Sequence, residues 1–178
     1  MGMKALFKKH CPPFILRPLR SWVSRMQSRR FRGRDPQDVF RQIFKDNHWG
    51  SGESVSGPGS EVAATRRISQ SLPKLLTTYR IRSMLDIPCG DFHWMELVEL
   101  GDCTYIGADI VPELIAVNSR KYASATRRFE TLDATKDALP HCDLVFCRDC
   151  FIHLPFELIL KAVANFKSSG SVTPLFER

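Results

Sequence analysis

Short apolar runs alternate with amphipathic stretches along the C-terminal two-thirds of the chain. Four apolar runs predict buried strands over residues 81–87, 103–109, 128–133 and 142–147. Apolar residues at helical spacing predict helices over residues 92–100, 112–122 and 156–166. This alternation predicts an α/β fold, a doubly wound Rossmann-like parallel sheet whose ligand lies at the carboxyl ends of its strands.

The first predicted strand ends in a turn that suits a nucleotide-like ligand. The strand carries one acid, Asp86, and breaks into a turn over residues 88–91. Gly90 lacks a Cβ, so the backbone there can approach a ligand closely. The helix predicted over residues 92–100 would direct its free N–H groups back at the strand end. The turn taken alone also fits an ordinary strand–turn–helix junction.

Acids recur where the second and third predicted strands end. Asp109 lies 19 residues beyond Gly90, and an acid at about this distance from a glycine turn can accept both hydroxyls of a ribose. Asp133 ends the third strand. The carboxyl ends of parallel strands meet at one edge of a sheet, so these acids are predicted to share one ligand site. A dinucleotide is not favoured, because the turn lacks the G-x-G-x-x-G pattern.

In order and spacing, these segments resemble the motifs of the class I S-adenosylmethionine (SAM)-dependent methyltransferases. The segments similar to the first four motifs of that family are Leu85–Gly90, Tyr105–Asp109, Leu132–Thr135 and Asp143–Leu154. The resemblance covers about residues 47–167. Pro88 and Phe92 depart from it, because they stand where the family usually has glycines. The resemblance implies a sheet with strand order 3-2-1-4 and SAM as the cofactor.

The resemblance also implies a set of SAM contacts. Asp86 would hold the methionine ammonium end through water or backbone, and Asp109 would accept from the ribose hydroxyls. Asp133 would accept from the exocyclic amine of adenine. The full set of expected cofactor-binding residues is Asp86, Pro88, Cys89, Gly90, Asp109, Ile110, Leu132, Asp133, Ala134 and Trp49. A purely structural role as a turn cap stays open for Asp86 and Asp133.

A general base would come from the segment after the fourth strand, where a methyl acceptor arrives. Asp149 and His153 are the candidate catalytic residues, and histidine has the intrinsic pKa to take a proton from a hydroxyl or an amine near neutral pH. Alternatively, His153 bonds a backbone carbonyl and Asp149 caps the helix that begins near Pro155. Arg148 is also placed to hold an acidic acceptor.

A segment rich in glycine and serine precedes the predicted sheet. Residues 47–60 contain four glycines, which is typical of a flexible linker. Trp49 and Glu53 are unusual in a linker, and the segment leads into a helix expected over residues 60–79. Similar segments precede the first motif in a subset of the methyltransferases, so residues 49–60 are expected to form a lid over the SAM site.

Positive charge is concentrated at the N-terminus. Residues 1–34 hold ten Lys or Arg and no acid, whereas the other 144 residues hold 16 basic and 19 acidic side chains, a net charge of −3. A mildly acidic domain does not favour nucleic acid as a partner. The basic leader is expected to be disordered or to contact a membrane surface, and the alternative is an arginine-rich organellar targeting segment.

The cysteines indicate a reducing compartment and argue against a zinc site. Six cysteines, mostly in predicted strands or at their ends, suit a reducing compartment and a cytoplasmic location. Cys147 and Cys150 form a C-x-x-C pair, but no second ligand pair completes a zinc site. No metal ligands are therefore expected.

The patterns divide the chain into three parts. Residues 1–34 form the leader, residues 35–80 hold N-terminal helices and the lid, and residues 81–178 form a partial SAM-binding domain. The segment 167–178 predicts no clear strand, whereas the family fold has three further strands. The chain is therefore expected to be truncated after its fourth strand, which would leave that strand as an exposed edge able to pair with a partner.

The sequence favours a SAM-dependent methyltransferase that transfers a methyl group to a small-molecule or sugar-like acceptor. The alternative is a truncated, non-catalytic methyltransferase-like fragment that binds a partner or SAM without turnover.

Overall fold

The computed structural model describes residue 29, residues 32–171 and residues 173–177. Most of the basic leader predicted over residues 1–34, with its expected disorder or membrane contact, lies outside the described residues. No helix within the described part of the chain is long and apolar enough to span a membrane.

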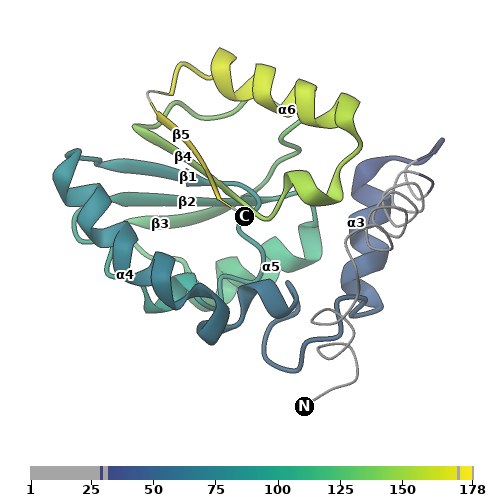
Figure 1. The fold of residues 1–178 in the computed structure, drawn as a ribbon, viewed down its shortest axis with the longest axis horizontal. Helices are drawn as coiled ribbons and strands as arrows, with labels where there is room; N and C mark the ends of the chain where they lie inside the picture. The colour runs from purple at the N-terminus through teal and green to yellow at the C-terminus, as the bar shows by residue number, and fades with distance from the viewer. Residues whose placement is uncertain (1–28, 30–31, 172, 178) are drawn as a thin grey trace, which may run out of the picture.

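A five-stranded parallel sheet forms the centre of the fold (Figure 1). Its strands are β1 (Ser83–Asp86), β2 (Thr104–Asp109), β3 (Arg127–Thr131), β4 (Leu144–Arg148) and β5 (Thr173–Glu177). They lie in the order β3-β2-β1-β4-β5, and every neighbouring pair is parallel. The predicted α/β class and the strand order 3-2-1-4 are confirmed.

Strand β5 corrects the prediction that no strand follows the last helix. It pairs with β4 from Leu144 opposite Thr173 to Arg148 opposite Glu177. The β4 edge is therefore covered along its whole length, and the predicted exposed edge is wrong. This strand could not be predicted from the sequence, because it contains Pro174 and no long apolar run. Proline cannot donate to a ladder, so an edge strand is where it fits.

Helices cover both faces of the sheet. The covering helices are α4 (Val62–Thr78), α5 (Pro112–Tyr122) and α6 (Phe156–Ser168), whereas α3 (Pro36–Lys45) lies beside the sheet. In Figure 1, α4 and α5 lie on one side of the sheet and α6 on the other. The two cores agree with this arrangement: Met84 of β1 packs in the cluster of α4 and α5, and its neighbour Leu85 packs in the cluster of α6. Alternation along buried strands thus fills both layers.

The residues at its N-terminus explain where α3 begins, and the start of α5 was predicted. Asp35 caps α3, since its Oδ1 accepts a hydrogen bond of 2.7 Å from the backbone N–H of Gln37, and Pro36 occupies the first helical turn. The residues predicted for α5 match the helix at both ends. Helix α3 brings Phe40 and Phe44 to the carboxyl edge of the sheet, where both line a cavity.

The helix predicted over residues 92–100 is absent, because only a 3₁₀ turn forms there at Met95–Leu97. Phe92 adopts a left-handed φ of 59° and is fully buried. Its ring contacts three other aromatic rings, those of Tyr105, Tyr122 and Phe129. The apolar side chains that suggested a helix fill the core from an irregular loop, so the turn after β1 does not lead into an α-helix.

Candidate active site

A cavity lies where the carboxyl ends of β1 to β4 meet the segment that follows α3. Every residue that the sequence assigned to the cofactor or to catalysis lines it. These residues are Trp49, Asp86, Pro88, Cys89, Gly90, Asp109, Ile110, Leu132, Asp133, Ala134, Asp149 and His153. The fold thus brings together groups that are up to 104 positions apart in the chain, from Trp49 to His153.

Asp86 places a buried carboxyl group at the end of β1. Its Oδ2 accepts a hydrogen bond of 2.6 Å from the Tyr105 hydroxyl, while Oδ1 is buried and has no hydrogen-bond partner within the described residues. Burial raises the pKa of Asp86 to about 7; the bond from Tyr105 opposes this shift, and the charge of Asp109 adds to it. An unsatisfied buried acceptor is costly, so Oδ1 is suited to a donor from a ligand.

Asp109 fixes the geometry of the glycine turn. Its Oδ2 accepts from the backbone N–H of Gly90 at 3.2 Å, and its Oδ1 accepts from that of Val111 at 3.0 Å. Gly90 has a φ of 57°, which favours glycine. Burial raises the pKa of Asp109 to about 6, although the backbone bonds oppose the shift. The carboxylate therefore links the ends of β1 and β2 and keeps lone pairs for a ligand.

The raised pKa of Asp86 predicts that ionisation of this group destabilises the folded protein. In the unfolded chain Asp86 has its ordinary pKa of 3.8, whereas in the folded protein its pKa is about 7. The folded state holds the proton more tightly, so this stabilisation is complete below pH 3.8 and is lost as the pH rises to about 7. The free energy of unfolding of the wild type, relative to Asp86→Asn, should fall by up to about 1.4 kcal/mol per pH unit in this window.

Urea unfolding of both proteins between pH 4 and pH 8 measures this difference. Asp109 is present in both proteins, so its titration largely cancels. Parallel stability curves across the window would contradict the account of Asp86.

Asp133 caps the turn that follows β3. Its Oδ1 accepts from the backbone N–H and the hydroxyl of Thr135, at 2.8 and 2.7 Å, and its Oδ2 lies 3.3 Å from Lys136 Nζ. Asp133 therefore has the turn-capping role that the sequence left open. A contact with a ligand would be made in addition to this cap.

The segment predicted as a lid lies against the site. Trp49, Val55, Ser56 and Ser60 line the cavity. The indole of Trp49 packs against the imidazole of His153 with ring centroids 4.5 Å apart. Gly57, at a φ of 96°, leaves room for Trp49 in this position, because a Cβ on residue 57 would lie 2.8 Å from the Cβ of Trp49.

The two candidate bases differ in their surroundings. Burial lowers the pKa of His153, and the charge of Asp149 opposes that shift, so the imidazole is neutral near pH 7. His153 Nδ1 is buried and accepts or donates no hydrogen bond among the described residues, so the carbonyl-bonding alternative is not seen for this atom. Asp149 does not cap α6, whose N-cap is Pro155. Instead, Asp149 pairs with Arg148 at 3.0 Å.

Sequence reasoning missed two polar residues of this region. Tyr105 reads as a core residue of β2, and only the three-dimensional structure shows its hydroxyl bonding Asp86. Asp91 was part of the predicted turn but had no role; it accepts hydrogen bonds from the lid. No group of three or more His, Cys, Asp or Glu residues suited to a metal ion occurs in the described chain.

No protein-family model and no curated protein matches this chain. Solved structures do match it. Magnesium protoporphyrin IX methyltransferase from Synechocystis PCC 6803, solved with bound SAM, is 18% identical over 76% of this chain and 72% of its own, with a TM-score of 0.51. N-methyltransferase NodS from Bradyrhizobium japonicum is 15% identical over 71% of this chain and 67% of its own, with a TM-score of 0.55. The chain therefore has the fold of the class I SAM-dependent methyltransferases.

Proposed function

We propose that this protein binds SAM at the carboxyl edge of its sheet and transfers the methyl group to a small-molecule acceptor. The observation that carries the proposal is the convergence of Asp86, Asp109 and Asp133, from the ends of three adjacent strands, in one cavity beside the Gly90 turn. The fold supports it, because similar folds include enzymes solved with SAM or S-adenosylhomocysteine.

The acidic residues at the site complement the positive charges of SAM. Burial raises the pKa of both Asp86 and Asp109, so the two carboxylates are costly to ionise side by side. SAM carries an ammonium and a sulfonium group, and positive charge beside these acids favours their ionised form. The free acceptor Oδ1 of Asp86 suits the ammonium end, directly or through water.

The residues also fit the nucleoside part of SAM. Asp109 has lone pairs left for the two ribose hydroxyls. Ile110, Leu132 and Ala134 also line the cavity, and they would provide an apolar surface for adenine. Asp133 would accept from the adenine amine while it caps its own turn.

When bound, SAM supplies an activated methyl group, so the protein mainly has to orient the acceptor and exclude water. Trp49, Phe40 and Phe44 form aromatic walls of the cavity. Such walls suit the face of a ring or a sugar, which is why we propose a small-molecule or sugar-like acceptor. His153 lines the cavity, and burial lowers its pKa, so its neutral imidazole would receive the acceptor's proton.

Transfer of a labelled methyl group tests the proposal. Purified protein is incubated with [methyl-³H]SAM and fractionated small-molecule extracts, and label in the acceptor fraction is measured. We expect transfer by the wild type and none by Asp109→Ala. Label that enters only macromolecules would contradict a small-molecule acceptor, and SAM binding without any transfer would contradict the enzymatic activity.

A further inference from the structure

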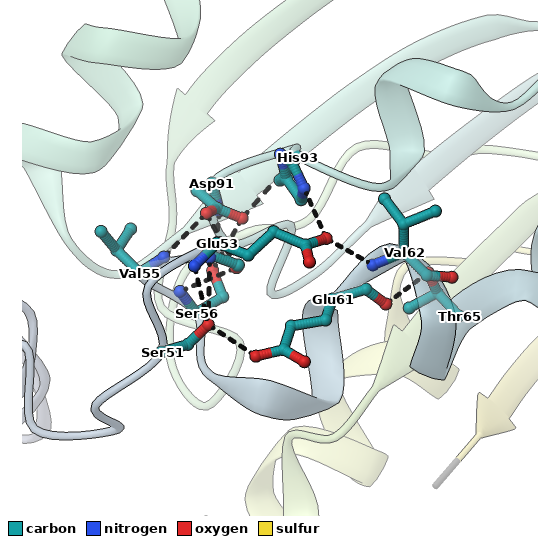
Figure 2. Close-up of polar contacts among 10 residues, drawn as sticks. Ser51, Glu53, Val55, Ser56, Glu61, Val62, Thr65, Asp91 and His93 are labelled. Carbon is teal, nitrogen blue, oxygen red and sulfur yellow. Dashed lines mark hydrogen bonds and ion pairs between the residues drawn. The ribbon is translucent and has the colours of Figure 1, made fainter.

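A network of hydrogen bonds joins the lid to the turn after β1 (Figure 2). The carboxylate of Asp91 accepts from Ser54 Oγ at 2.8 Å, from the backbone N–H of Val55 at 3.0 Å and from Ser56 Oγ at 3.1 Å. In return, the backbone N–H of Asp91 donates to Ser56 Oγ at 2.8 Å. One side chain thus holds three consecutive lid residues.

A second carboxylate, that of Glu53 on the lid, also joins the lid to the segment after β1. Glu53, on the lid, lies 3.0 Å from His93 Nε2 on the turn and accepts from the backbone N–H of Val62 at 2.7 Å. Val62 is the first residue of α4, whose N-cap residue makes no side-chain cap bond. Ser51 braces the lid internally, because its hydroxyl accepts from the backbone N–H groups of Glu53 and Ser54.

The network lies directly beside the proposed cofactor site. Ser56 lines the cavity and packs so closely on the glycine turn that a Cβ at Gly90 would lie 2.3 Å from its hydroxyl. Val55 also lines the cavity, whereas Asp91 is not among the residues that line it. Asp91 therefore does not reach the cavity itself, and its contacts with the lid connect it to residues that do.

We propose that Asp91 is a positioning residue, which fastens the lid over the Gly90 turn and thereby slows release of the cofactor. This role rests on the proposed function. An ionised carboxylate suits the task because it is acceptor-only and has about four lone-pair sites for the donors of the lid. Asparagine has nearly the same shape but only one acceptor oxygen, and its amide would present N–H groups to donors.

Two sets of substitutions test the role from both sides of the network. Asp91→Asn removes acceptors on the turn, and the double variant Ser54→Ala with Ser56→Ala removes the hydroxyl donors on the lid. Asp102→Asn, at an exposed acid in the loop before β2, is the matched control. Opening of the lid is measured without SAM as the rate of cleavage after Glu53 by a glutamate-specific protease. Release of radiolabelled SAM is measured by dilution into excess unlabelled SAM.

We expect Asp91→Asn and the double serine variant each to raise both rates by at least about tenfold, since bonds to a charged group are lost. Combining the two sets should add little further, because they remove the same contacts. Asp102→Asn should match the wild type.

Unchanged cleavage in both variants would overturn the role of Asp91 as the lid anchor. Faster cleavage with unchanged SAM release would overturn its role at the cofactor site. A folded wild type that retains no SAM would overturn the proposed function as well, and the cleavage rates would then show separately whether Asp91 holds the lid.

Discussion

Asp109→Ala is expected to weaken SAM binding by at least about 100-fold, because the two hydrogen bonds that we propose between the ribose hydroxyls and this charged group would be lost. The substitution also releases the backbone N–H groups of Gly90 and Val111, which the carboxylate holds at 3.2 and 3.0 Å. The turn that must approach the ligand therefore loses its support together with the direct contact. Equilibrium dialysis with radiolabelled SAM measures the affinity.

The control for this prediction is an acid with the same local role at the other end of the sheet. Asp143 Oδ2 accepts from the backbone N–H groups of Arg82 and Ser83 at 2.8 and 3.0 Å. Asp143→Ala should therefore cost stability in a similar way but leave SAM affinity close to that of the wild type. Equal losses of affinity in both variants would mean that Asp109 acts only through stability, and undiminished binding by Asp109→Ala would remove it from the site.

Phe92→Ala is expected to lower the free energy of unfolding by about 3–5 kcal/mol, the usual cost of removing a fully buried phenylalanine. The ring of Phe92 lies 5.0 to 5.3 Å from those of Tyr105, Tyr122 and Phe129, and the guanidinium of Arg127 lies 4.8 Å from its centre. Removal of the ring would leave a cavity among these packed side chains. Urea unfolding monitored by circular dichroism measures the loss.

The control for Phe92 is Leu97, a large apolar residue of the same loop that is 61% exposed. Leu97→Ala should change the free energy of unfolding by no more than about 0.5 kcal/mol. Phe92→Gly would relieve the left-handed backbone but should still be strongly destabilised, since relief of such strain is worth only about 1–3 kcal/mol. A loss below about 1 kcal/mol for Phe92→Ala would contradict the packing described here.

The sheet and the cavity edge could be predicted from sequence because buried parallel strands leave a strong apolar pattern. The acids Asp86, Asp109 and Asp133 interrupt or end those runs, and parallel strands necessarily bring such ends together. The order of the strands followed from the resemblance of the motifs to a known fold.

Two elements could not be predicted, for different physical reasons. Residues 92–100 have apolar residues at helical spacing, but tertiary packing overrides that pattern by burying Phe92, Trp94 and Met95 from a loop. Strand β5 has little pattern of its own and is formed by pairing with β4. Local sequence contains no information on either long-range contact.

The hydrogen bonds of the site could not be predicted from the sequence either. Ser54 and Ser56 read as linker residues, and their partner Asp91 lies 37 and 35 positions away. The bond from Tyr105 to Asp86 joins two strands. Such pairings depend on the angle of one side chain in the folded protein, which periodicity does not determine.

Isothermal titration of the wild-type chain with SAM at pH 7.5 decides whether this cavity binds SAM. We expect saturable binding at one site per chain, competition by S-adenosylhomocysteine, and no binding of NAD, because the turn lacks the glycine pattern that a pyrophosphate needs. Absence of binding by a cooperatively folded protein, or equal binding of NAD, would contradict the assignment of this cavity to SAM.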